Sequence, residues 1–462
     1  MVPLLPEDVW RCVASFIPYR QLLPLISVNK AFYNIVMNAK YQEIHWTMLN
    51  GSMIKSLARL RTPSIAGRVR RLHVRAWFIE YLIQRESLMA PSCVVNSTRW
   101  LSRRLRRPST STSSPLSTGH DILASMTTAV RLMTQVTEYS FEWRDLSPTT
   151  DTLRFLTATR TAFGASLRKL TLHAPLANFA NLLSTVDFEN LEELELHFDH
   201  DNHVDAHSAK LLRETIAPFV NHFRRSIWSL LIASASKMDL SPLLSALEEF
   251  PHLRTFRAYL AFDAAHLADP RGLVQILRLN SETLLNVELA RSFVASSDAA
   301  PNPASTWPAL SLALSSERNA LLNLRTLRLP LLATFDATMV CLRKSADTLT
   351  RLCLVDSFLT EKELVELVQN FAHRPFDSGL RYLNVGLVFL TVDVFDLLAS
   401  RLPGLLNLNL LLADGVIGRV VATLLSSVKH LSGTSTPTGN SVIWGSGRSG
   451  SSTHPRRGRS GC

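Results

Sequence analysis

The chain has 462 residues, of which 46% are hydrophobic, and this length allows two or three domains with a large core. No apolar run approaches the roughly 18 residues that a membrane helix needs, so the composition excludes a protein held in a bilayer by such helices. The net charge of +11 comes mostly from residues 84–119 and 430–462, which carry +5 and +4, so nucleic acid is not an expected partner.

The first forty residues predict three short helices. Pro6 suits a first helical position, and Glu7 and Asp8 suit the positive end of the helix dipole. One apolar face recurs at helical spacing before Pro18, at Val9, Val13, Phe16 and Ile17. Two further apolar patches follow, first Leu22, Leu23, Leu25 and Ile26, then Val28, Phe32, Ile35 and Val36. A segment this short cannot bury three apolar faces by itself. It therefore requires the rest of the chain or a partner to cover them.

This pattern resembles the F-box, the module that joins a substrate receptor to an SCF-type ubiquitin ligase. Leu5-Pro6-Glu7 matches the opening motif of that family, and Phe16-Ile17-Pro18 matches the end of its first helix. The resemblance implies that the chain docks on a Skp-type adaptor through Leu5, Pro6, Glu7, Val9, Trp10, Val13, Leu22, Leu23, Leu25, Val28 and Phe32. The alternative is an ordinary helical cap on the rest of the fold.

The next segment is predicted to continue as helix from Tyr41 to Leu60. Residues 69–76 then predict a strand, because apolar and polar side chains alternate there. Residues 99–119 are rich in Arg, Ser and Thr and predict a disordered insert, because they cannot bury enough apolar surface to offset chain entropy. A phosphorylation site at Ser109 is the functional alternative. The Gly-, Ser- and Arg-rich tail at 431–462 is also predicted to be disordered.

Between these segments, short strands recur with the pattern Leu-x-x-Leu-x-Leu. They include Leu167/Leu170/Leu172, Leu191/Leu194/Leu196, Ile227/Leu230/Ile232, Leu253/Phe256, Leu284/Val287/Leu289, Leu324/Leu327/Leu329, Leu349/Leu352/Leu354, Leu380/Leu383/Val385 and Leu405/Leu408/Leu410, with Tyr139/Phe141 as a possible start. Helical runs separate them, the clearest beginning with a capping box at Thr360 and Glu363. Strand and helix at this spacing resemble an irregular leucine-rich-repeat solenoid with a parallel sheet, an α/β fold.

The predicted organisation is an F-box at 1–45, a linker helix and first strand at 46–98, the disordered insert at 99–119, the solenoid at 120–430 and the tail at 431–462. The competing fold is a doubly wound α/β domain. No glycine-rich phosphate loop of the GxGxxG or GxxxxGK[ST] type is present to support it.

No constellation in the sequence predicts catalysis or a cofactor. The stretch His197–His207 holds four His and three Asp, which zinc can use, but Leu194, Leu196 and Phe198 favour a strand followed by a polar loop, so no metal site is predicted. There is no GxSxG elbow and no protease-like cysteine signature, so we expect no enzyme activity. The outward side chains of the repeat strands would line one face of the sheet, either as a binding surface or as a solvated one.

The resemblance implies a substrate-recognition subunit of an SCF-type cullin–RING E3 ubiquitin ligase. The F-box would bind the Skp-type adaptor and, through it, the cullin and RING subunits, while the repeats would hold a protein substrate. The alternative is a leucine-rich-repeat protein-binding scaffold acting outside a ubiquitin ligase. Five scattered cysteines without a CxxC pair predict reduced thiols, and Glu7 and Asp8 argue against a signal peptide, so the expected location is the cytoplasm or nucleus.

Overall fold

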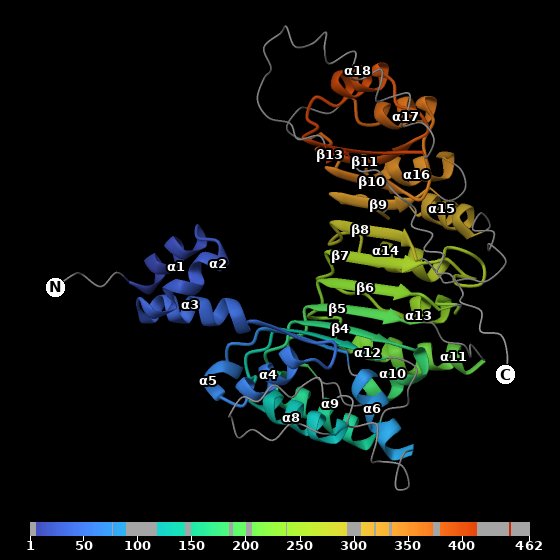
Figure 1. Ribbon diagram of the computed structural model, residues 1–462. Helices are drawn as coiled ribbons and strands as arrows, with labels where there is room; N and C mark the ends of the chain where they lie inside the picture. Colours follow the sequence, from blue (N-terminus) through green and yellow to red (C-terminus); the bar gives the residue numbers. More distant parts are fainter. Residues whose placement is uncertain are drawn as a thin grey trace, which may run out of the picture. The chain divides into compact units, whose positions relative to one another are not determined.

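The computed structural model describes residues 6–75, 77–88, 118–143, 149–183, 188–199, 206–236, 238–292, 306–317, 320–331, 335–372, 379–413 and 443–444 (Figure 1). The chain divides into two compact units. Unit 1 comprises Met1–Asn280 with Ser292–Pro301, and unit 2 comprises Ser281–Arg291 with Asn302–Cys462. Each unit is α/β, and its paired strands are parallel, which confirms the predicted fold class at this level.

Unit 1 begins with a helical module, which we define as residues 6–41. It contains α1 (Glu7–Ser15), α2 (Tyr19–Leu22), the 3₁₀ helix η1 (Leu23–Ser27) and α3 (Lys30–Tyr41). Pro24 lies in the first turn of η1, where its missing N–H costs little. Asn29 caps α3, because its side-chain oxygen accepts a 2.8 Å hydrogen bond from the backbone N–H of Phe32.

The helical module has a small core of its own. Ala14, Leu22, Phe32 and Val36 are buried together, and the partly buried Trp10, Ile17, Leu25, Ile26 and Ile35 pack against them. The rings of Trp10 and Phe32 lie 5.1 Å apart and are tilted by 53°. Arg68 ties α3 to the following chain by donating hydrogen bonds to the side chains of Asn34 and Asn38. The module is therefore held by one compact apolar cluster and by polar contacts along α3.

The predicted helix from Tyr41 to Leu60 is wrong in its first part. Residues Glu43–Trp46 form strand β1, and helix α4 occupies only Gly51–Leu60. The physical reason is a period of two, because Ile44 and Trp46 are buried while Glu43 and His45 face outward. Asn50 then starts α4 by accepting a 2.9 Å hydrogen bond from the backbone N–H of Met53.

Seven parallel strands of unit 1 lie side by side in chain order. After β1 they are β2 (Arg71–Arg75), β3 (Glu138–Glu142), β4 (Lys169–Ala174), β5 (Glu193–Phe198), β6 (Ser229–Ser234) and β7 (Thr255–Leu260). The helices of this unit are α5 (Pro63–Ala66), α6 (Trp77–Leu88), α8 (Gly119–Arg131), α9 (Thr150–Phe163), α10 (Leu176–Leu183), α11 (Ala206–Leu211), the π-helical turn η2 (Leu212–Ile216), α12 (Ala217–His222), α13 (Ser241–Ala246) and α14 (Arg271–Leu279).

Unit 2 repeats the same alternation of strand and helix. Its strands are β8 (Asn286–Arg291), β9 (Thr326–Pro330), β10 (Arg351–Val355), β11 (Tyr382–Leu387), β12 (Asn407–Leu412) and β13 (Ile443–Trp444). Its helices are α15 (Thr306–Ser316), α16 (Phe335–Ser345), α17 (Glu361–Gln369) and α18 (Val392–Arg401). The predicted capping box is present, with Thr360 and Glu363 satisfying each other's backbone N–H groups at the start of α17.

In both units the helices that follow the helical module lie along one side of the strands (Figure 1). Side chains on that side are buried, whereas those on the other side are mostly half-buried and polar, as β5 shows: Leu194, Leu196 and Phe198 are buried, and Glu193, Glu195 and His197 are not. Each leucine buried in this way contributes roughly 1.5–3 kcal/mol, so the repeated leucines supply the main driving force for folding. The predicted inward and outward directions are confirmed for this strand.

Both predicted disordered segments fall mainly outside the described residues. Residues 99–117 of the insert are not described, but Thr118 and Gly119 belong to the start of α8, where Thr118 and Asp121 form a capping box. Within the tail the described residues are Ile443 and Trp444, which pair with β12. Because α8 begins at Gly119, the insert ends before residue 119, slightly earlier than the sequence predicts.

Candidate protein-binding surfaces

The first candidate surface lies on the helical module. We define its apolar surface as five exposed side chains from α1, η1 and the residue that follows each of them: Val9, Val13, Phe16, Leu23 and Val28. Phe16 is 82% exposed and Val28 is 60% exposed. Of the 16 large hydrophobic side chains exposed in the described part of the chain, seven lie between residues 9 and 33, so apolar exposure is concentrated in this module.

The structure divides the predicted adaptor-binding residues into two groups. Leu22 and Phe32 are buried in the module's core, and Trp10 and Leu25 are partly buried against it. The exposed members are Pro6, Glu7, Val9, Val13, Leu23 and Val28, whereas Leu5 lies outside the described residues. Phe16 is the most exposed apolar side chain of the module and was missing from the predicted set, although its helical spacing with Val9 and Val13 indicated it.

The second candidate surface is the outward side of β1–β7, which we call the charged face. Acidic and basic side chains alternate across the strands, since Glu43, Arg71, Glu138, Lys169 and Glu193 are successive neighbours in register. Arg71 bridges Glu43 at 3.0 Å and Glu138 at 3.6 Å. Because opposite charges lie beside each other on every step from β1 to β5, the charges on this part of the face are largely paired within the protein.

Glu195 on β5 collects more partners than the other residues named on the charged face. Its Oε1 accepts 2.8 Å hydrogen bonds from Lys169 Nζ and Arg257, and its Oε2 accepts one of 3.1 Å from Thr171. Burial alone would raise the pKa of Glu195, but the hydrogen bond from Lys169, the nearby His197 and the charges of Lys169 and Arg257 hold it well below its usual value. Glu195 therefore stays ionised and links three strands.

Two pairs of stacked histidines also lie on the charged face. His45 on β1 and His73 on β2 have ring centroids 4.6 Å apart, and His173 on β4 and His197 on β5 have centroids 3.7 Å apart. Burial, with a contribution from His197, lowers the pKa of His173 to about 4. Burial and the neighbouring His45 likewise lower the pKa of His73. Both residues are therefore neutral at pH 7.

The outward side of β8–β12 in unit 2 has a different character. The guanidinium group of Arg351 lies 4.0 Å from the centre of the Tyr382 ring, a cation–π contact. Asn384 donates a 3.2 Å hydrogen bond to Cys353 Sγ. Burial raises the pKa of the Cys353 thiol, although the charge of Arg328 opposes this, so Cys353 is a poor nucleophile.

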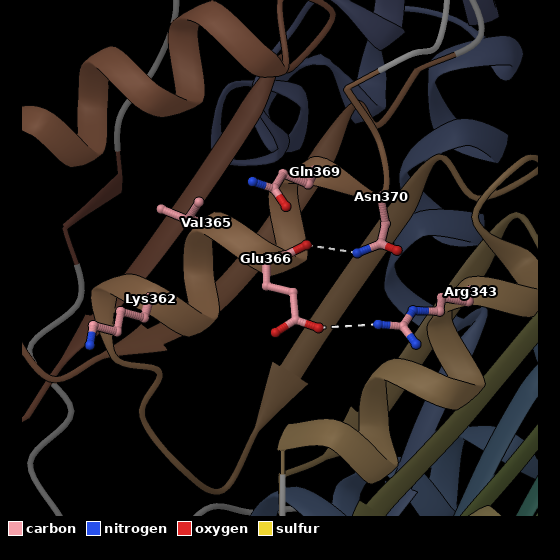
Figure 2. Close-up of a pocket in the computed structure, with 6 residues that line it drawn as sticks. All are labelled: Arg343, Lys362, Val365, Glu366, Gln369 and Asn370. Carbon is pink, nitrogen blue, oxygen red and sulfur yellow. Dashed lines mark hydrogen bonds and ion pairs between the residues drawn. The ribbon is translucent and has the colours of Figure 1, made fainter.

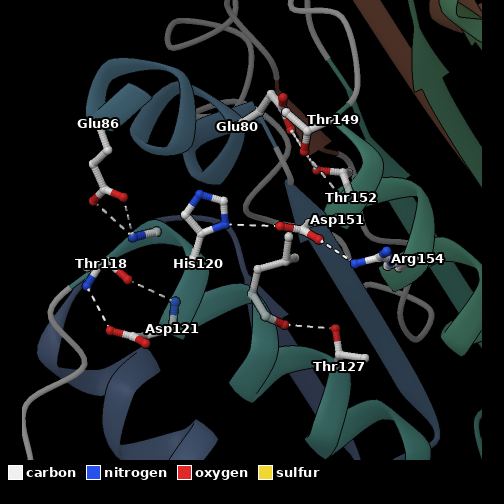
Figure 3. A network of polar contacts seen from close by, with 12 residues as sticks. Glu80, Glu86, Thr118, His120, Asp121, Thr127, Thr149, Asp151, Thr152 and Arg154 are labelled. Atoms are coloured by element: carbon white, nitrogen blue, oxygen red, sulfur yellow. Dashed lines mark hydrogen bonds and ion pairs between the residues drawn. The ribbon is translucent and has the colours of Figure 1, made fainter. Parts of the chain in front are cut away.

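A polar network joins α6, α8 and α9 in unit 1 (Figure 3). The buried Glu80 accepts a 2.6 Å hydrogen bond from Thr152 Oγ1 and one of 3.3 Å from Thr149 Oγ1. Beside it, His120 Nδ1 lies 3.0 Å from Asp151 Oδ2. Thr149 also caps α9, so these contacts fasten helix starts and provide no recognisable triad of nucleophile, base and orienting group.

An open depression of about 660 Å³ lies between α16 and α17 on the helical side of unit 2 (Figure 2). Its lining residues are Arg343, Lys362, Val365, Glu366, Gln369 and Asn370. Arg343 is paired with Glu366 at 3.1 Å, and Asn370 donates a 2.7 Å hydrogen bond to the backbone oxygen of Glu366. The carboxylate that lines the depression, Glu366, is therefore engaged in an ion pair with Arg343.

The histidine-rich stretch that the sequence offered as a metal candidate is only partly described. His197 lies on the charged face, as predicted, while residues 200–205 lie outside the described residues. None of the helices in the described part of the chain has the length and hydropathy needed to span a bilayer.

Comparison with known proteins provides no identification. The chain matches no model of a protein family, and no curated protein is significantly similar to it. The proposed function therefore rests on two surfaces, the apolar surface of the helical module and the outward faces of the parallel strands.

Proposed function

We propose that this chain is the substrate-recognition subunit of an SCF-type cullin–RING E3 ubiquitin ligase. The helical module is the F-box and binds a Skp-type adaptor, which connects the chain to the cullin and RING subunits. The strands and helices after it form a leucine-rich-repeat solenoid whose outward strand faces hold a protein substrate. Ubiquitin transfer is performed by other subunits, so the proposal requires no catalytic residue, metal or cofactor in this chain.

The apolar surface of the helical module is the observation that supports this proposal most. Val9, Val13, Phe16, Leu23 and Val28 are exposed although the module already has a compact core beneath them. Apolar side chains gain about 25 cal/mol for each Å² removed from water, so such a surface favours burial by a partner. Its position within the F-box-like segment makes a Skp-type adaptor the expected partner.

Leucine-rich strands and a polar outward face support the second half of the proposal. Solenoids bind partners along extended sheet faces of this kind, and the charged face and the face of unit 2 both present polar side chains on parallel strands. We propose a cytosolic or nuclear location, which the free thiols of Cys12, Cys341 and Cys353 support.

The test is binding of the purified chain to a purified Skp-type adaptor. A variant carrying Leu23→Ala and Val28→Ala should bind the adaptor more weakly by about 2 kcal/mol or more, which is roughly 30-fold. Its thermal stability should hardly change, because both side chains are exposed. The matched control is Phe389→Ala with Leu406→Ala, which removes two exposed apolar side chains from unit 2 and should leave adaptor binding intact.

Normal adaptor binding by the Leu23/Val28 variant would contradict the assigned docking surface. Absence of binding by the unmodified chain would reject the ligase function. In that case the open strand faces would still support the alternative, a leucine-rich-repeat scaffold that binds proteins outside a ubiquitin ligase.

A further inference from the structure

We infer that Glu43, His45 and His73 form a binding site for a divalent transition-metal ion such as Zn²⁺ on the charged face. His45 and His73 are direct neighbours in the register of β1 and β2, and Glu43 lies two residues before His45 on the same side of β1. Each residue offers one ligand atom, and the three atoms lie within 4.8 Å of one another. Imidazole nitrogen and carboxylate oxygen are ligands that zinc uses in proteins.

The distances between the ligand atoms fit one ion. His45 Nε2 lies 2.9 Å from Glu43 Oε1, and His73 Nε2 lies 3.6 Å from the same oxygen. Ligand atoms that surround a tetrahedral zinc at about 2.0–2.1 Å are separated from each other by roughly 3.3 Å. The two observed separations lie on either side of this value, so Glu43 Oε1 already lies at about ligand spacing from each imidazole nitrogen.

The histidine rings must rearrange before both can bind the ion. They are stacked at an interplanar angle of 6°, and an imidazole nitrogen binds metal in the plane of its ring. One ring must therefore turn about its second side-chain torsion, which is broad for histidine. The side chain of His45 is 54% exposed and has room to make this rotation.

The neighbouring arginine does not occupy the ligand atom. Arg71 bridges the other carboxylate oxygen, Glu43 Oε2, at 3.0 Å, which leaves Oε1 directed at the two histidines. Arg71 also lies 3.6 Å from Glu138 Oε1, so its charge has a second carboxylate partner on β3. Glu43 can therefore bind an ion through one oxygen while it keeps its ion pair through the other.

Three protein ligands leave one coordination position for water or for a group from a bound molecule. Glu43 and His45 also line a cavity of about 570 Å³ that runs beside the edge strand β1 and α4. The open position is thus next to a space that a small ligand can enter. The ion would also fasten β1 to β2, just after the helical module.

The second histidine pair on the same face provides the matched control. His173 and His197 are stacked still more closely, but Glu195 Oε2 is 4.0 Å from His197 Nε2. Both oxygens of Glu195 already accept hydrogen bonds, from Lys169 and Arg257 on one side and Thr171 on the other. Among the described residues the group of three ligand atoms within 4.8 Å of one another is Glu43, His45 and His73 and does not include this pair, so the pair should not bind zinc tightly.

The experiment uses the full chain without a tag and freed of metal by a chelator. Zinc is titrated in competition with a chromophoric chelator, and Co²⁺ is added separately to record the visible absorption of tetrahedral coordination. We expect one zinc per chain bound at micromolar concentration. His45→Ala and His73→Ala should each weaken binding by more than about 10-fold and remove the cobalt absorption. The control, His173→Ala with His197→Ala, should bind as the unmodified chain does.

Circular dichroism identifies a variant that loses its fold. In that case zinc binding is measured with His45→Asn instead, because this substitution changes an exposed side chain. Unchanged zinc binding in the His45 and His73 variants would overturn the inference. So would loss of binding on replacing His200, His203 and His207 by Ala, because this result would locate the ion in the histidine-rich stretch. Failure of the unmodified chain to bind zinc at micromolar concentration would also overturn it.

Discussion

Glu195→Ala should lower the free energy of unfolding at pH 7 by about 2–3 kcal/mol. The carboxylate accepts 2.8 Å hydrogen bonds from Lys169 and Arg257, and hydrogen bonds to charged groups contribute roughly 1.5–3 kcal/mol each. The loss is smaller than the sum of two such bonds, because Lys169 keeps a second carboxylate, Glu193, at 3.4 Å. Arg257 loses more, since its Nε already lacks a partner in the structure.

Denaturant unfolding followed by circular dichroism measures this difference. The control is Glu192→Ala, because Glu192 forms a more exposed ion pair with Arg168 at 3.3 Å, which should contribute less than about 1 kcal/mol. Equal losses in the two variants would refute the argument that Glu195 links three strands.

The pH dependence gives a second check on the same residue. A carboxylate with a lowered pKa stabilises the fold above its ordinary pKa of 4.5, and this stabilisation is lost as the pH falls through the folded-state pKa. The difference between the unmodified chain and Glu195→Ala should therefore shrink as the pH falls below about 4.5. A difference that stays constant down to pH 3 would contradict the proposed charge on Glu195.

Three further predictions concern other parts of the fold. Burial lowers the pKa of His173 from its ordinary value of 6.5 to about 4, so the folded state should lose stability as the pH falls from 6.5 to 4. His173→Gln should flatten this part of the profile of melting temperature against pH. Gly272→Ala should lower the free energy of unfolding by about 1–3 kcal/mol in thermal melting, because its Cβ would lie 2.6 Å from the backbone nitrogen of Ser245. The control, Gly51→Ala, adds a Cβ with nothing within 4 Å and should leave stability unchanged. Phe32→Ala should destabilise the helical module by about 3–5 kcal/mol, seen as faster amide exchange in α1 and α3 with β4–β6 still protected.

The sequence by itself determined the α/β class and the repeated strands, because leucines at alternate positions can be buried only if the chain is extended there. It also determined the start of α17, because Thr360 and Glu363 satisfy backbone groups within a single turn. Local spacing also indicated helices in the first forty residues, where the structure has α1, α2, η1 and α3. These features depend on residues that are close to each other in the chain, so they can be predicted from the sequence alone.

The tertiary structure decided which side chains meet. Strand β1 is short and lies between helices, so its two inward residues, Ile44 and Trp46, are too weak a signal alone and need pairing with β2 to be recognised. The approach of Glu43 and His45 to His73 depends on that pairing and on its register. In the helical module, spacing identified the apolar residues, but only packing buried Phe32 and left Phe16 in solvent, because contacts between helices are not encoded in the periodicity of each one.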